Sequence, residues 1–108
     1  MAADTGHRAL AEELRRRARA GADPAATSAA LRIGADEQAD AREPYADLAR
    51  TIGEASYRVT DAQVAAVRDA AGSDLGAFEV VLAAGVGAGL RRWDAAIRAI
   101  EEARDAAG

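Results

Sequence analysis

The fold is decided by one apolar stretch, residues 78–93, which reads FEVVLAAGVGAGLRRW. Its larger apolar residues recur at steps of three and four, and this spacing continues through Ile97 to Ile100. Such steps place side chains along one face of an α-helix. The stretch therefore predicts helix, with a kink or a break near Gly89, where closely spaced glycines also let the backbone of another helix approach.

Helix signals stand directly before this stretch. Thr60, with Gln63 three residues later, forms a capping-box pattern, so we expect a helix to begin there. Gly72 is typical of the position that closes a helix. Ser73 or Asp74 then caps the helix that carries the apolar stretch.

The first half of the chain predicts three more helices. Residues 9–20 carry apolar residues on one stripe and form the first. Asp23 is a capping residue and Pro24 suits a first helical turn, so together they predict the start of a second, short helix. This helix ends near Gly34. Residues 45–55 have amphipathic spacing and form the third.

The composition agrees with an all-α fold. The chain has 108 residues, the size of a single domain, which we assign to residues 1–108. Alanine, the best helix former, supplies 32 residues, whereas only 22 are larger apolar or aromatic residues. We expect five to six short helices and no strand, arranged as an orthogonal or antiparallel bundle.

The composition also excludes several kinds of chemistry. The chain has no cysteine, so thiol nucleophiles, disulfides and cysteine-ligated metals are absent. Its one histidine, His7, has no companion ligand or base and is expected to be exposed. The glycines at 85–89 follow no strand and so do not form a dinucleotide-binding loop. We expect no metal and no cofactor.

Charge and hydropathy bear on location and partners. The formal net charge of −4 argues against nucleic-acid binding. The longest apolar run, residues 78–90, is shorter than the roughly 20 residues that span a membrane. The N-terminus lacks the pattern of a signal peptide. We therefore expect a cytoplasmic protein with neither a nucleic-acid nor a membrane partner.

Glu79 is the most informative charged residue, because it opens an otherwise apolar segment. It favours the start of a helix electrostatically. It also fits a half-buried acid or the partner of a buried arginine, for which Arg91 and Arg92 are the candidates, within one chain or between subunits.

Two segments, residues 57–72 and 78–92, resemble the C-terminal part of the alkylhydroperoxidase D-like and carboxymuconolactone decarboxylase-like proteins. Shared features are a helix closed by glycine, a capped helix with a phenylalanine–glutamate pair, small residues, and a final amphipathic helix. The resemblance covers about residues 45–103 and leaves residues 1–40 unassigned. It implies an all-helical, usually oligomeric protein.

The resemblance implies a CxxC pair and a histidine in the redox members of this superfamily. Counted back from Gly72, those positions fall near Tyr57, Thr60 and Val64, and none of the three has the required side chain. Peroxidase and disulfide-reductase chemistry are therefore excluded even within this fold.

The decarboxylase branch, by the same resemblance, needs no cysteine pair. There Glu79 would be the catalytic acid–base group, and Arg91 or Arg92 would bind a substrate carboxylate. Tyr57 and Trp93 would line the pocket. One carboxylate without a positioned partner supports proton transfer only weakly.

Two functions follow as expectations. The first is a non-redox, non-catalytic member of the superfamily that acts as a small oligomeric scaffold or accessory protein. It would self-associate through residues 75–100, which hold nearly half of the larger apolar side chains. The alternative is a cofactor-free enzyme of the decarboxylase type, or a small-carboxylate-binding protein, that uses Glu79 with Arg91 or Arg92.

Overall fold

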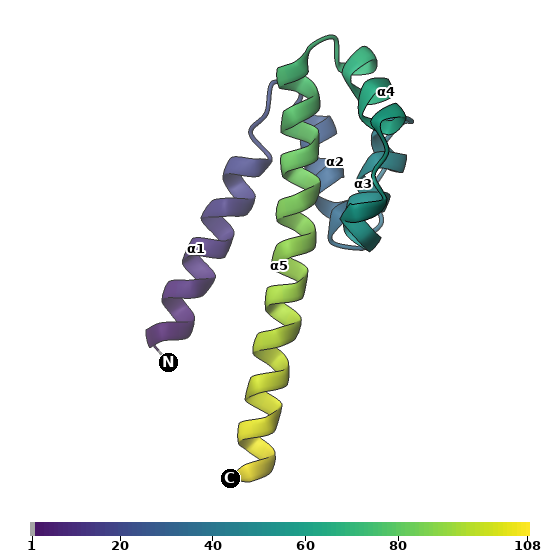
Figure 1. The fold of residues 1–108 in the computed structure, drawn as a ribbon. Coiled ribbons are helices and arrows are strands. Elements are labelled where there is room, and N and C mark those ends of the chain that lie inside the picture. The colour runs from purple at the N-terminus through teal and green to yellow at the C-terminus, as the bar shows by residue number, and fades with distance from the viewer. Residues whose placement is uncertain (1) are drawn as a thin grey trace.

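Helices make up nearly the whole of the chain (Figure 1). A computed structural model describes the backbone of residues 2–108 and the side chains of residues 6–108. Over this range no strand is found, so the predicted all-α fold is confirmed. The elements are α1 (Ala2–Ala18), α2 (Pro24–Gly34), α3 (Tyr45–Ala55), the short 3₁₀ helix η1 (Ser56–Arg58), α4 (Asp61–Ala71) and α5 (Asp74–Ala107).

Helix ends follow the local sequence signals. The Asp23 carboxylate accepts a hydrogen bond from the Ala26 amide at the start of α2. Thr60 and Gln63 form the predicted capping box at the start of α4. Gly72 closes α4 in the left-handed conformation, with a φ of 81°. The Ser73 side chain, rather than Asp74, then caps α5.

The core is a thin layer of mostly small side chains between α5 and the helices α2, α3 and α4. Leu48 and Val67 are its largest fully buried apolar residues. α2 makes the most extensive contact with α5, which the sequence did not predict. Glycines allow it: a Cβ at Gly34 would collide with the Ala84 backbone, and one at Gly87 with the Leu31 carbonyl.

α5 corrects one sequence expectation. It runs unbroken for 34 residues, so the predicted break near Gly89 is wrong. Glycine weakens a helix interior by about 1 kcal/mol but leaves the hydrogen-bond ladder intact. Gly87 instead marks a close contact between helices, because it lies against the Leu31 carbonyl of α2.

The molecule is elongated, with principal extents of 54 × 25 × 20 Å. α2, α3 and α4 pack around the first half of α5, and the second half projects beyond them (Figure 1). α1 runs antiparallel to this second half, and Arg15 of α1 forms an ion pair with Asp94 of α5 at 3.2 Å. The C-terminal turns of α5 are largely exposed.

Candidate functional site

The carboxylate of Glu79 has a structural partner. Its Oε2 atom accepts a hydrogen bond from the backbone amide of Ala22 at 2.6 Å, in the loop between α1 and α2. Gly21 lies so close that a Cβ there would collide with this carboxylate. The buried Thr27 hydroxyl secures the same loop by donating to the Arg19 carbonyl at 2.9 Å. Glu79 therefore anchors the loop to α5.

The two candidate arginines lie elsewhere. Arg91 forms an ion pair with Asp36, with 3.4 Å between Nη2 and Oδ2, just after the end of α2. Arg92 donates to the backbone carbonyl of Gly53 in α3 at 2.9 Å. Twelve or thirteen residues of straight helix separate them from Glu79, which is about 18–20 Å along the axis. The fold does not bring the acid and these arginines together.

The two candidate aromatic residues lie on different elements. Tyr57 lies on η1 with 83% of its surface exposed, and its ring contacts the Arg58 guanidinium. Trp93 lies on α5, 43% exposed, with its ring edge-to-face against His7 at a centroid distance of 5.6 Å. They do not line one pocket. Nothing in the sequence predicts the contact between His7 and Trp93.

A depression does adjoin Glu79. It has a volume of about 370 Å³ and lies among α2, α4 and α5. Thr27, Arg42 and Tyr45 contribute to its walls together with Glu79, and the Arg42 guanidinium lies 5.7 Å from the centre of the Tyr45 ring. Sequence reasoning missed Arg42, because it stands in an irregular segment with no recognisable pattern.

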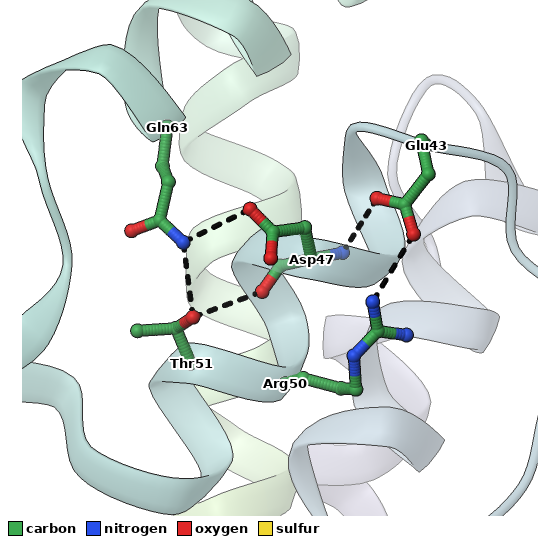
Figure 2. A network of polar contacts seen from close by, with 5 residues as sticks. All are labelled: Glu43, Asp47, Arg50, Thr51 and Gln63. Atoms are coloured by element: carbon green, nitrogen blue, oxygen red, sulfur yellow. Dashed lines mark hydrogen bonds and ion pairs between the residues drawn. The ribbon is translucent and has the colours of Figure 1, made fainter.

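A polar network joins α3 to the start of α4, as Figure 2 shows. The side-chain amide of Gln63 donates to the Asp47 carboxylate and to the Thr51 hydroxyl, both at 3.0 Å. Glu43 accepts from the Asp47 amide at 3.0 Å and from Arg50 at 3.1 Å. Every acidic group in this network already has hydrogen-bond donors of its own chain, so the network is structural.

One face of α5 is apolar and uncovered. It lies opposite the buried face of the helix, at steps of three and four residues, and every member is exposed. We call it the outer strip; it comprises Leu75, Phe78, Leu82, Gly85, Gly89, Trp93, Ala96, Ile100 and Ala103. Phe78 is 59% exposed and Leu82 is 47% exposed. No charged residue interrupts it.

α1 extends this apolar surface. His7, Leu10 and Leu14 are spaced three and four residues apart and so share one face of α1. Because His7 contacts Trp93, this face adjoins the outer strip. Leu10 and Leu14 are both exposed. The uncovered apolar surface thus spans two helices.

The glycines of the outer strip differ from the three helical glycines that lie between packed helices. A Cβ at Gly85 or at Gly89 would have no atom within 4 Å. By contrast, Gly34, Gly53 and Gly87 each face the backbone of a neighbouring helix at close range. The predicted close approach of another helix is therefore seen at Gly87, while Gly85 and Gly89 form an open notch.

Comparison with models of protein families, with curated proteins and with solved structures finds no match to this chain. Across the described residues, no three or more acidic or histidine side chains are grouped as a metal ion requires. Taken one at a time, the helices of residues 2–108 are too short or too polar to cross a membrane. α4 and α5, bent by 119°, pass that test only as a pair.

Proposed function

We propose that this chain is a non-catalytic, self-associating protein, a small scaffold or accessory protein whose assembly surface is the outer strip of α5. The observation that carries the proposal is the exposure of Leu75, Phe78, Leu82 and Trp93 along one uninterrupted line. A contiguous exposed apolar patch marks an interaction surface. Covering a large apolar side chain stabilises by about 1.5–3 kcal/mol, a sizeable share of a small domain's stability.

The contacts of the candidate catalytic residues support a non-catalytic reading. Glu79 holds the α1–α2 loop through the Ala22 amide, and Arg91 and Arg92 each bind another part of the chain. General acid–base catalysis needs a group within hydrogen-bond reach of the substrate proton. A carboxylate that already anchors a loop serves that role poorly.

The proposal retains the superfamily resemblance and a cytoplasmic location, with no cofactor. Its support is the order of elements in the second half: α4 ends at Gly72, Ser73 caps α5, and α5 carries the phenylalanine–glutamate pair. The absence of cysteine makes this chain a non-redox relative within the proposal.

The experiment compares two matched aspartate variants by sedimentation equilibrium at micromolar concentration. Leu82→Asp places a charge in the outer strip, and we expect it to convert an oligomer into a monomer. Tyr57→Asp places the same charge at an exposed aromatic residue away from the strip, and we expect it to leave the oligomer intact. A wild-type chain that is monomeric, or an oligomer that survives Leu82→Asp, contradicts the proposal.

A second candidate function rests on the depression beside Glu79, where Arg42 takes the place expected for Arg91 or Arg92. An arginine there pairs with a carboxylate in bidentate fashion. This candidate predicts binding of a small dicarboxylate, with muconate as the probe, measured by isothermal titration calorimetry. Loss of binding in Arg42→Ala, but not in the exposed control Arg58→Ala, supports it. No binding to the wild-type chain eliminates it.

A further inference from the structure

We infer that residues 75–93 of the outer strip are covered by a second copy of this chain, with the two α5 helices antiparallel and Phe78 of each seated over Gly89 of the other. This inference rests on the proposed function and names its partner and register. It follows from the order of large, small and charged residues along α5, which is complementary to itself in one orientation.

The first observation is the order of large and small residues. The first half of the strip carries Phe78 and Leu82, and the next two positions are Gly85 and Gly89. The pair Phe78 with Gly89 and the pair Leu82 with Gly85 are both centred between residues 83 and 84. A single two-fold axis at that point therefore places each large side chain opposite a glycine of the other copy.

The glycines make the close approach sterically open. Nothing in the chain lies within 4 Å of a Cβ built at Gly85 or Gly89, so the notch is free to receive a side chain. Gly34, Gly53 and Gly87 are three positions in this molecule where a helical glycine lies against the backbone of another helix. A second helix on the outer strip extends the same packing.

Charges on the flank of the strip match the same axis. Asp74 and Arg92 are 18 residues apart, which is five turns of 3.6 residues, so both lie on one side of the strip. Their midpoint is residue 83, within half a residue of the axis defined by the apolar pairs. In an antiparallel pair, Asp74 of each copy therefore lies at the same height as Arg92 of the other copy. The two-fold axis makes this pairing occur twice.

Both charges retain bonding capacity for a partner. The Asp74 side chain is 91% exposed, and its nearest cation is Arg68 at 3.9 Å. Arg92 uses one N–H for the Gly53 carbonyl and is otherwise exposed. Leu75 and Trp93 agree with this axis, because their midpoint, residue 84, lies within half a residue of it. Large, small and charged positions thus agree on one register.

A parallel pair lacks this complementarity. It would place every residue beside its own copy, with Phe78 against Phe78 and an empty notch where Gly85 and Gly89 meet. In a parallel two-fold pair, the flank that carries Asp74 and Arg92 lies across from the opposite flank of the partner helix, so these two charges do not meet. The antiparallel arrangement is therefore the one the residues favour.

The first test is a charge-reversal cycle read by sedimentation equilibrium. Asp74→Arg and Arg92→Asp each place like charges together across the axis, and we expect each to weaken dimerisation about tenfold or more. The double variant restores opposite charges and is expected to recover most of the affinity. Asp69→Arg, on the exposed side of α4, is the control and leaves the dimer unchanged. A double variant weaker than both single variants overturns the register.

The second test uses the absence of cysteine, since any introduced thiol is unique. Gly85→Cys lies near the axis and is expected to cross-link efficiently to its own copy with a short bis-maleimide. Ala103→Cys, on the same strip, lies about 58 Å from its copy in the antiparallel pair, at 1.5 Å per residue, and is expected not to react.

The outcomes separate the two claims. Cross-linking at Gly85→Cys alone supports the inference. An oligomer that cross-links through Ala103→Cys, or through neither thiol, leaves the proposed self-association standing but overturns the antiparallel register. A chain of monomer mass under all conditions overturns both.

Discussion

The carboxylate of Glu79, in the second turn of α5, binds the amide of Ala22 across 57 positions of sequence, with 2.6 Å between Oε2 and the amide nitrogen. This contact fixes the loop that returns the chain from α1 into α2. It turns the residue that the sequence presents as a candidate acid into a structural one. The helix face that we propose for function is the outer strip, which lies opposite the buried face of α5.

The Glu79 contact predicts a stability effect. Glu79→Ala leaves the Ala22 amide to water and is expected to lower the free energy of unfolding by about 1.5 kcal/mol, the low end for a hydrogen bond to a charged group, because this bond is exposed. Glu79→Gln keeps an acceptor and is expected to cost less. Urea denaturation measures both values, and equal stability of Glu79→Ala and the wild type would contradict this role.

The capping box at Thr60 predicts a second effect. Its hydroxyl accepts the Gln63 amide at 3.2 Å, and its own amide donates to the Gln63 side chain at 3.0 Å. Thr60→Ala is expected to lower the free energy of unfolding by about 0.5–2 kcal/mol. Thermal or urea unfolding tests this, with Thr60→Ser, which keeps the hydroxyl, as the control close to wild type.

Gln63 also tests the network of Figure 2. Gln63→Glu preserves the acceptor for the Thr60 amide but removes the two N–H donors to Asp47 and Thr51 and sets two carboxylates against each other. We expect this variant to be less stable than the wild type at neutral pH, with the difference shrinking as acid protonates the carboxylates. If Gln63→Glu loses the same free energy of unfolding at neutral and at acidic pH, repulsion from Asp47 plays no part.

Gly85 and Gly87 of α5 provide matched alanine variants that test the packing of this helix. Gly87→Ala is expected to destabilise the chain, because its Cβ would collide with the Leu31 carbonyl of α2. Gly85→Ala meets open space and is expected to stabilise the monomer by up to about 1 kcal/mol through helix propensity. Unfolding is measured at low protein concentration, so that association does not contribute. The same sign for both variants would contradict the packing described here.

Glu13 on α1 predicts a pH effect of known sign. Hydrogen bonds from Arg16 and Arg17 lower the pKa of Glu13 from 4.5 to about 2. A carboxyl whose pKa is lower in the folded state stabilises above its unfolded pKa, and this contribution is lost as the pH falls from about 4.5 to about 2. The ¹³C shift of the Glu13 carboxyl should report the low pKa, and Arg16→Ala should raise it. A titration near 4.5 in the wild type would rule out these ion pairs.

The features that the sequence predicts correctly are local ones. The caps at Asp23, Thr60 and Ser73 and the stop at Gly72 depend on side chains within a few residues, so their patterns suffice. The break near Gly89 was predicted wrongly, because glycine lowers helix propensity but leaves the hydrogen-bond ladder of a helix intact.

The candidate site shows the same division. The sequence singled out Glu79, but its partner is a backbone amide, and backbone groups carry no residue-specific signal. Arg42 reaches the depression from an irregular segment and was missed for that reason. The apolar excess of residues 75–100 was visible in the sequence, whereas its division into a buried face and the outer strip required the packing of α2 and α3.

The most direct test of self-association through the outer strip is the mass of the unmodified chain in solution. Sedimentation equilibrium at micromolar concentration is expected to give twice the monomer mass of 11.1 kDa, and Leu82→Asp is expected to return it to the monomer value. A wild-type mass of 11.1 kDa across the micromolar range would contradict the account.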